Sequence, residues 1–225
     1  MPGTLYVVAT PIGNLEDITF RAVRVLKEVD LIACEDTRQA LKILNRHEIR
    51  KELVAFFESR ERERLPRILE RLRRGQSVAL ISDAGTPAIS DPGFRLVREA
   101  VREGIRVVPV PGPSAFAAAL SAAGLPTHRF LFLGFPPPKL EAARKKLLSV
   151  REEEGTLVFY LPGRKLADFA RLVNDALGTR TMVVAREMTK IHEEFVRGHP
   201  GEILQYFDNK QIKGEICLLI QGVGK

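Results

Sequence analysis

Short hydrophobic runs alternate with longer amphipathic stretches through the first half of the chain. Buried runs rich in β-branched residues predict strands at Leu5–Ala9, Leu31–Cys34, Leu53–Phe56, Ser77–Ile81 and Ile105–Val110. The stretches between them have apolar residues at helical spacing and predict helices at Asp17–Glu28, Thr37–Arg46, Glu61–Arg74 and Phe94–Arg102. This alternation is typical of an α/β domain with a wound, mostly parallel sheet.

The pattern changes after Val110, where Pro-Gly-Pro-Ser leads into the alanine-rich stretch Ala115–Ala123. We therefore predict a domain boundary here, with an N-terminal α/β domain at 1–112 and a C-terminal α/β domain at 113–225. Further strands are expected at Phe130–Phe135, Thr156–Leu161, Thr181–Glu187, Glu193–Arg197 and Glu215–Ile220, and helices at Ala115–Ala123, Lys139–Val150, Lys165–Leu177 and Pro200–Phe207. Two of these strands follow each other without a helix between them, so the second sheet is predicted to be mixed.

The charge of the chain favours polyanionic partners. There are 35 Lys and Arg residues against 28 Asp and Glu residues, which leaves a formal net charge of +7. Seven arginines and four glutamates lie within residues 58–74 at helical spacings, which fits either an ion-paired helix face or an RNA-facing patch.

Cysteine content and hydropathy indicate the cellular location of the protein and whether it holds a metal site. The two cysteines, Cys34 and Cys217, lie in apolar runs and are expected to be buried free thiols in a reducing compartment. No metal site is predicted. No apolar run approaches the roughly 20 residues of a membrane span, and no secretion signal is recognisable, so we expect a cytoplasmic protein without membrane contact.

The loops that follow the predicted strands carry the candidate chemistry, because ligands of wound α/β sheets lie beyond the carboxyl ends of strands. Ser82–Gly93 is the most informative, with two Gly, two Pro, two Asp, two Ser and one Thr in twelve residues. Such a loop suits a ligand like S-adenosylmethionine (SAM), because it offers N–H groups, acceptors and close backbone approach. Two others, Thr10–Leu15 and Val110–Ala115, combine proline with glycine, and none has a dinucleotide or P-loop fingerprint.

The fourth loop, Cys34–Arg38, contains two adjacent acidic residues, Glu35 and Asp36. Asp36 or Thr37 suits the cap of the next helix, and the alternative role of the acids is substrate binding.

Taken together, these loops resemble the tetrapyrrole methylase superfamily, and within it the bacterial small-subunit rRNA (cytidine-2′-O-)-methyltransferases. The segments that carry the resemblance are LYVVATPIGNLEDIT (5–19), CEDTR (34–38), ISDAGTPAISDPGF (81–94), VPVPGPSA (108–115), FLGFPPPK (132–139), FYLPGRKL (159–166), REMTKIHEEFVRG (186–198) and KGEICLLIQG (213–222). The chain ends soon after Gly222, whereas these enzymes usually have a further C-terminal helical segment.

The resemblance implies a two-domain tetrapyrrole-methylase-like fold with SAM in a cleft between the domains, and a homodimer. The residues at the positions of the family's cofactor contacts are Pro11, Asp83, Ala84, Gly85, Thr86, Ile89, Ser90, Pro111, Gly112, Ser114, Tyr160, Leu161, Ala185 and Gly214. The implied activity is 2′-O-methylation of a cytidine ribose near the decoding centre of small-subunit rRNA, in an assembled or assembling 30S particle.

Methyl transfer to a hydroxyl requires alignment and removal of its proton, which acidic residues can accept. The candidate bases are Asp36 and Glu35, and then Glu187. Substrate contacts are expected at Asn14, Arg38, Arg186 and Lys190. The group around Glu187 and Lys190 also fits an ion-paired surface hairpin.

Three other functions compete with this interpretation. Another methylase of the superfamily could act on a tetrapyrrole or a protein side chain, and a non-catalytic RNA-binding protein could assist ribosome assembly. A nicotinamide dehydrogenase is disfavoured because the glycine fingerprint is absent.

Overall fold

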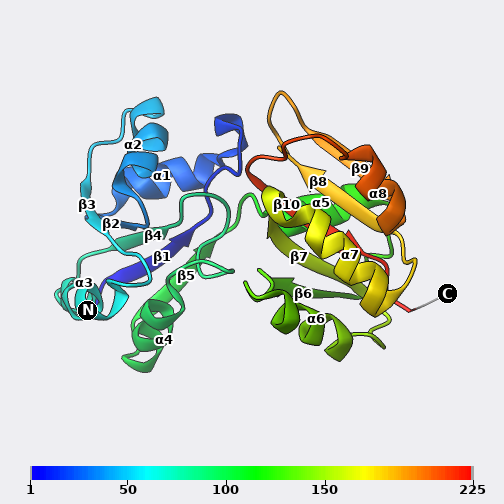
Figure 1. The fold of residues 1–225 in the computed structure, drawn as a ribbon. Helices are drawn as coiled ribbons and strands as arrows, with labels where there is room; N and C mark the ends of the chain where they lie inside the picture. Colours follow the sequence, from blue (N-terminus) through cyan, green and yellow to red (C-terminus); the bar gives the residue numbers. More distant parts are fainter. Residues whose placement is uncertain (1, 224–225) are drawn as a thin grey trace. The chain divides into compact units, whose positions relative to one another are not determined.

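A computed structural model describes residues 2–223 of the chain. The chain divides into two compact units, Met1–Ser114 and Ala115–Lys225, whereas the sequence predicts a boundary after Gly112. Each unit is a five-stranded sheet covered by helices, so the α/β class is confirmed (Figure 1).

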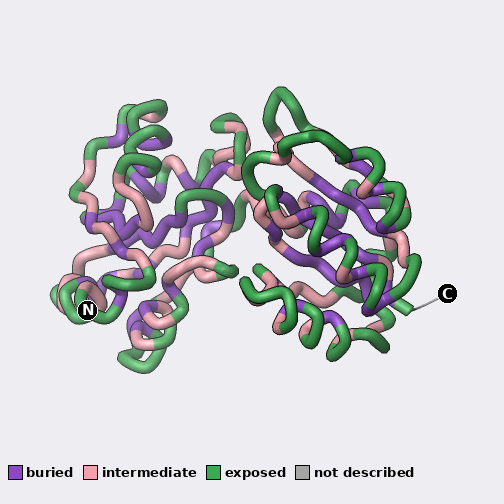
Figure 2. Tube along the Cα trace, in the orientation of Figure 1, coloured by how far each residue is buried: buried purple, intermediate pink, exposed green. Residues whose placement is uncertain are grey.

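The sheet of the N-terminal unit is parallel throughout, with the strand order β3-β2-β4-β1-β5. Its strands are β1 (Thr4–Val8), β2 (Leu31–Cys34), β3 (Glu52–Ala55), β4 (Val78–Ile81) and β5 (Arg106–Val110). Its α-helices are α1 (Phe20–Glu28), α2 (Thr37–Arg46), α3 (Glu61–Arg73) and α4 (Phe94–Arg102). All residues of β2 and β4 are buried, as expected for central strands covered on both faces (Figure 2).

Two hydrophobic clusters show which helices cover which face of this sheet. Leu26 of α1 and Leu44 of α2 pack with Val8 and Ile32 on one face. The opposite face packs against α3 and α4, where Leu72 belongs to the second cluster. Successive residues of a strand point to opposite faces of the sheet, so each face packs against its own layer of helices.

The structure corrects the predicted start of the first helix. The sequence predicts that it begins at Asp17, but Leu15–Asp17 forms a separate 3-10 turn, η1, and α1 begins at Phe20. The Thr19 hydroxyl accepts a hydrogen bond from the Ala22 N–H at 3.0 Å. The helix begins after Thr19 because this side chain satisfies an N–H that has no partner within the helix.

The arginine-rich helix α3 has an ion-paired surface. Glu52 pairs with Arg71 at 2.7 Å and with Arg67 at 3.5 Å, and Glu103 pairs with Arg73 at 2.6 Å. These pairs favour the ion-paired helix face over the RNA-facing patch.

The C-terminal unit has a mixed sheet, as predicted, with the strand order β6-β7-β10-β8-β9. Its strands are β6 (Phe130–Gly134), β7 (Thr156–Pro162), β8 (Met182–Arg186), β9 (Glu194–Gly198) and β10 (Glu215–Ile220). Its helices are α5 (Ala115–Ala123), α6 (Leu140–Ser149), α7 (Leu166–Leu177) and α8 (Pro200–Tyr206), with the 3-10 turn η2 (Gly163–Lys165) before α7. The β6–β7 pair is parallel and the other pairs are antiparallel.

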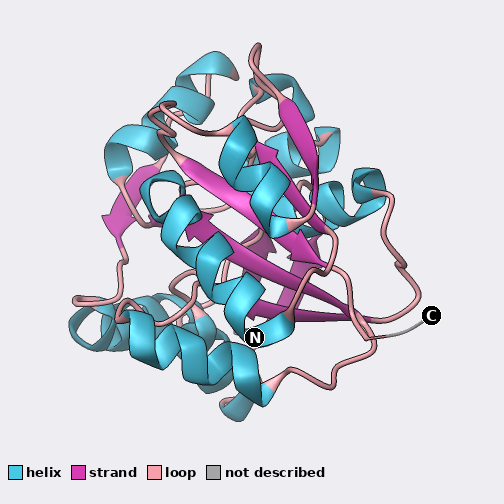
Figure 3. Cartoon of the chain, turned by 45° about the vertical axis from the view of Figure 1, so that its right-hand side comes forward, coloured by secondary structure: helices cyan, strands magenta, loops and turns pink. Residues whose placement is uncertain are grey.

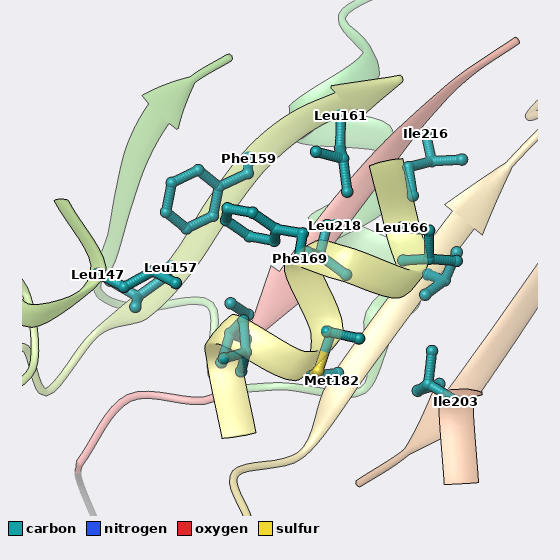
Figure 4. Close-up of a cluster of buried hydrophobic side chains, with 14 of the residues drawn as sticks. Leu147, Leu157, Phe159, Leu161, Leu166, Phe169, Met182, Ile203, Ile216 and Leu218 are labelled. Atoms are coloured by element: carbon teal, nitrogen blue, oxygen red, sulfur yellow. The ribbon is translucent and has the colours of Figure 1, made fainter. Parts of the chain in front are cut away.

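The two faces of this sheet are packed differently. On one face lies α5, whose small residues Ala119 and Ala123 pack against the strands. The opposite face is covered by α6, α7 and α8 and contains large side chains, among them Phe159 and Phe169 with ring centroids 5.3 Å apart (Figure 4). Small residues on α5 permit close approach of its backbone to the sheet.

The described residues were also searched for a membrane-spanning helix and for a metal site. Within residues 2–223, no helix combines the length and apolar character needed to cross a membrane. The same residues contain no group of three or more His, Cys, Asp or Glu side chains able to hold a metal ion.

Candidate active site

The loops that follow β1 and β4 are joined by backbone pairing. The Thr10 N–H donates to the Gly85 carbonyl at 2.9 Å, and the Gly85 N–H donates to the Thr10 carbonyl at 3.0 Å. The buried Thr10 hydroxyl also donates to the Ser82 carbonyl at 3.1 Å. These bonds bring Pro11 and the glycine-containing loop together at one edge of the N-terminal sheet.

The loop after β4 has an unusual backbone. Gly85 has a φ of 81°, and two non-glycine residues, Ala88 and Ser90, have φ values of 67° and 61°. Non-glycine residues rarely adopt positive φ, and such strain persists where surrounding contacts enforce it, often at ligand sites. Asp83, Ala84, Ile89 and Ser90 remain exposed on this loop, which leaves their polar groups accessible to a ligand. Figure 3 shows loops joining the strands to the helices of the chain.

The loop after β5 closes against the same edge. The Thr86 hydroxyl donates to the Pro113 carbonyl at 3.1 Å, which connects this loop to the one after β4. A Cβ atom added to Gly112 would lie 3.0 Å from the Ala9 Cβ, so glycine permits this approach. The structure thus places the ten predicted cofactor residues of this unit on three interconnected loops.

The loop after β2 is linked to this group through Asp83, whose carboxylate accepts a hydrogen bond from the Asp36 N–H at 2.9 Å. Asp36 itself caps α2 by accepting from the Arg38 N–H at 2.8 Å. It also forms an ion pair with the Arg38 guanidinium at 2.7 Å. The predicted cap is therefore present, and it coexists with a position beside the candidate cofactor loop.

Arg38 also changes the acidity of Asp36. Its side-chain hydrogen bonds, followed by its backbone N–H and its charge, lower the pKa of the Asp36 carboxyl. A lowered pKa makes Asp36 a weaker proton acceptor and a more persistent anion. The Arg38 side chain is 87% exposed, so it can reach a ligand outside the protein while retaining this partner.

Cys34, at the end of β2, is a buried free thiol, as predicted. Burial is the main reason that its pKa rises to about 12, with Asp83 and Asp36 adding repulsion. Cys217 is also buried, and its pKa is raised to about 12 by burial. Both thiols are protonated at neutral pH and are unsuited to nucleophilic chemistry.

Asn14, a predicted substrate contact, has a local structural role. Its side chain accepts a hydrogen bond from the Glu16 N–H at 3.1 Å and caps η1. The structure thus explains this residue as a cap, and its contact with substrate remains a prediction.

Tyr160, Ala185 and Gly214, predicted in the C-terminal unit, belong to three neighbouring strands or their ends. Tyr160 of β7 and Ala185 of β8 both pair with Cys217 of β10. The Gly214 carbonyl, just before β10, accepts from the Gly163 N–H at 2.8 Å. The sheet order therefore brings these residues together.

The side chains of these residues differ in accessibility. Leu161 and Ala185 are fully buried, so only their backbone groups could contact a ligand. The Tyr160 hydroxyl accepts a hydrogen bond from the Phe116 N–H at 3.2 Å, near the start of α5. The Tyr160 ring packs edge-on against Phe132, with centroids 5.1 Å apart, and this fixes the ring orientation.

The turn between β8 and β9, residues 187–193, is held by charged groups. Lys190 pairs with Glu187 at 3.1 Å, and Arg186 pairs with Glu194 at 3.0 Å. The Thr189 N–H donates to the Glu193 carboxylate at 2.6 Å. The ion-paired hairpin considered in the sequence analysis is present, while RNA contact by the same residues remains a prediction.

Sequence reasoning did not assign a role to Thr10 of the site loops. Its hydroxyl connects to a carbonyl 72 residues away, and the only local signal is a polar residue directly after a buried strand. The role of Thr10 became recognisable only when the strand order was known.

Comparison with known proteins shows the family of the chain. Residues 4–204 match the family described as Tetrapyrrole (Corrin/Porphyrin) Methylases. The chain is 47% identical over 223 residues to the Ribosomal RNA small subunit methyltransferase I of Halalkalibacterium halodurans, covering 99% of this chain and 77% of that protein. It is 45% identical to the protein of the same name from Thermotoga maritima, covering 98% of this chain and 99% of that one.

A solved structure shows the same fold at much lower identity. A cobalt precorrin-4 methyltransferase, a cobalamin biosynthetic enzyme, aligns with a TM-score of 0.71 and 19% identity, covering 97% of this chain and 94% of that chain. At this identity the similarity concerns the fold alone.

Proposed function

Because the chain belongs to the tetrapyrrole (corrin/porphyrin) methylase family, we propose that it transfers a methyl group from SAM to the RNA of the small ribosomal subunit. The observation that carries this proposal is the identity of 47% and 45%, over nearly the whole chain, to proteins named ribosomal RNA small subunit methyltransferase I. The chain is thus a methyltransferase of rRNA. The methyl donor, the acceptor atom and the roles of individual residues are the finer parts of the proposal.

The three N-terminal loops have the chemistry that SAM requires. SAM combines a carboxylate, an ammonium and a sulfonium with an adenosine, and it supplies an electrophilic methyl group when bound. Asp83 offers an exposed carboxylate to the positive groups, and the loop backbone offers N–H groups to the carboxylate. Gly85 and Gly112 allow these loops to pack closely, against Ile12 and Ala9 respectively.

We assign the remaining cofactor contacts as the resemblance implies. In the N-terminal unit they are Pro11, Ala84, Thr86, Ile89, Ser90, Pro111 and Ser114. In the C-terminal unit they are Tyr160, Leu161, Ala185 and Gly214, with Leu161 and Ala185 acting through backbone groups because their side chains are buried.

The proposed acceptor is a ribose 2′-hydroxyl of cytidine, whose proton must be removed during transfer. Positioning provides most of the acceleration, and a base adds about 10²–10⁴-fold. Glu35, Asp36 and Glu187 are the candidates. Asp36 and Glu187 are each paired with a cation, Arg38 and Lys190, so each would have to exchange that partner in order to accept a proton. The lowered pKa of Asp36 favours an anchoring role for it.

The RNA backbone is proposed to contact basic side chains around the site. Arg38, Arg186 and Lys190 can exchange their carboxylate partners for phosphates, and Asn14 adds a polar contact. The formal charge of +7 supports binding of a polyanion. A homodimer acting on an assembled or assembling 30S particle, in the cytoplasm, completes the proposal.

Methylation of ribosomal subunits tests this function directly. The protein is incubated with labelled SAM and small subunits from a strain that lacks the modification, and the labelled nucleotide is then mapped. We expect one 2′-O-methyl mark on a cytidine of the small-subunit rRNA. Transfer to a corrinoid precursor, or absence of label in RNA despite SAM binding, would contradict the proposal.

A further inference from the structure

A cavity of about 830 Å³ lies in the C-terminal unit, and none of the predicted catalytic residues lines it. It is lined by η2, the first turns of α7, the end of α8 and the segment 207–214 that leads into β10. This volume is within the usual range of small-molecule and nucleotide sites. Its lining includes Gly214, and its other residues have no role in the function proposed above.

The walls of the cavity are fixed by backbone contacts. A Cβ atom on Gly163 would lie 2.7 Å from the Ile212 side chain and 2.8 Å from its carbonyl, so only glycine permits this packing. The Gly163 N–H donates to the Gly214 carbonyl, and Asn209 has a φ of 57°. These contacts restrict the backbone that lines the cavity, so the cavity has a defined shape.

Basic side chains dominate the charged lining. Arg164, Arg171, Lys210 and Lys213 face a single acidic residue, Asp208. Among the residues that the structure describes, none forms an ion pair with Arg164 or Lys213. Two exposed cations without a carboxylate partner favour an anionic ligand.

The rest of the lining has the character of a nucleobase site. Apolar walls come from Leu166, Ile203, Phe207 and Ile212, and amide groups come from Gln205, Asn209 and Gln211. Apolar side chains can pack against the face of a base, and amides can hydrogen-bond its edge. Cation, apolar and amide groups in one cavity match a nucleoside phosphate better than a bare anion.

The cavity is connected to the β8–β9 turn that is proposed to contact RNA. Lys210 lies 3.8 Å from the centroid of the Tyr206 ring, and the Tyr206 hydroxyl donates to Glu194, the partner of Arg186. A Cβ atom on Gly214 would lie 3.2 Å from Glu187 Oε1. An RNA strand that contacts the turn would therefore pass beside the cavity.

We propose that this cavity binds an unstacked nucleotide of the RNA substrate, with its phosphate held by Arg164 and Lys213 and its base against the apolar and amide wall. The proposal rests on the proposed rRNA methylation. The cavity would be a second site of contact with RNA, and it would increase the affinity of the protein for its substrate.

The test compares two double variants of equal charge change. Arg164→Glu with Lys213→Glu reverses two cations of the cavity, and Arg144→Glu with Lys145→Glu reverses two exposed cations of α6, which does not line it. Binding and methylation of unmodified small subunits are measured against salt concentration, SAM binding is measured by calorimetry, and circular dichroism checks folding.

We expect the cavity variant to bind small subunits at least about tenfold more weakly, with a salt dependence reduced by about one phosphate contact. Its SAM affinity and its kcat at saturating subunits should remain within about twofold of the wild type. The variant Arg164→Lys with Lys213→Arg retains both charges and should bind subunits nearly as the wild type does.

Three results would overturn the proposal. They are equal weakening by the α6 variant, loss of SAM affinity in the cavity variant, and unchanged subunit binding in the cavity variant. Failure of the proposed function is a separate result, because it would appear as absence of methyl transfer by the wild-type protein, whereas the binding comparison does not require catalysis.

Discussion

The loops that follow β1, β4 and β5 in the N-terminal unit are joined by hydrogen bonds between residues far apart in the sequence, whereas the turn between β8 and β9 in the C-terminal unit is held by hydrogen bonds and ion pairs within one hairpin. In the first region, Thr10 and Gly85 exchange two backbone bonds between loops that lie far apart in the sequence. Positive φ angles occur in both regions, at Ala88 and Ser90 in the first and at Glu187 and Thr189 in the second. In the second, Arg186 and Lys190 are bound to carboxylates on their own hairpin. A rigid backbone suits a small ligand of one shape, and exchangeable charge pairs suit a long polyanion.

This difference predicts different responses to substitution. Changes to the N-terminal loops should alter SAM binding because the backbone cannot adjust. Changes to the C-terminal turn should alter RNA affinity in a salt-dependent way because exposed ion pairs are screened.

The largest effect is expected for Gly85→Val. Gly85 has a φ of 81°, so valine strains the loop, and its Cβ would lie in contact with Ile12 Cγ2 at 3.4 Å, so the two γ-carbons of valine must fit beside Ile12. We expect SAM affinity to fall by at least about tenfold, by calorimetry, and the free energy of unfolding to fall by about 1–3 kcal/mol. Gly124→Val is the matched control, because Gly124 has a φ of 78° with no atom within 4 Å of its Cβ. It should lose similar stability while retaining SAM affinity, and equal loss of SAM affinity in both variants would contradict the prediction.

The second prediction separates the two roles of Asp36. Asp36→Asn keeps a capping side chain and removes the charge that pairs with Arg38. If the charge anchors the substrate, kcat/KM for small subunits should fall by roughly 10–100-fold while SAM affinity and thermal stability change little. Asp36→Ala should lose both the cap and activity, and full turnover with normal RNA affinity in that variant would show that the assigned role is wrong.

The lowered pKa of Asp36 gives a second test of whether this residue anchors the substrate or accepts the proton. Its pKa is lowered in the folded protein, so its ion pair with Arg38 is present at neutral pH and is lost only as the pH falls through that lowered value. We therefore expect no change in the kcat/KM profile attributable to Asp36 between about pH 5 and pH 8. An acidic limb in this range that disappears in Asp36→Asn would assign the proton transfer to Asp36 instead.

A smaller effect is expected for Lys190→Ala in the β8–β9 turn. The lysine pairs with Glu187 and is partly exposed, so its removal should raise KM for small subunits severalfold and reduce the salt dependence by about one contact. The kcat value should change little. A KM that stays constant at every salt concentration would leave Lys190 as a hairpin ion pair only.

The smallest effect is expected for Tyr206→Phe. The hydroxyl donates to Glu194, and this hydrogen bond raises the Tyr206 pKa above its ordinary value of 10.0. The stabilisation is complete below pH 10 and is lost as the pH rises through the raised pKa. We expect a melting temperature about 2 °C below that of the wild type at pH 8, with the two proteins converging at higher pH. Identical melting curves at pH 8 would show that the bond contributes nothing.

The elements of this protein could be predicted from sequence because their signals are local. β2 and β4 are continuous apolar runs, and the alternation of strands with amphipathic helices indicated the parallel sheet. The loop at 82–93 was recognisable from its Gly, Pro, Ser and Asp content, which no ordinary connection requires. The error at the start of α1 arose because a short 3-10 turn, η1, directly precedes the threonine that caps the helix.

Only the tertiary structure decided which loops touch and which charges are paired. The bond from Thr10 to Ser82, the position of Asp36 beside Asp83, and the cavity wall formed by Gly163 and Ile212 join residues far apart in the chain. Periodicity and composition describe neighbours along the sequence, so they determine elements and their faces. The strand order determines which loops lie side by side, and the candidate site consists of such neighbouring loops.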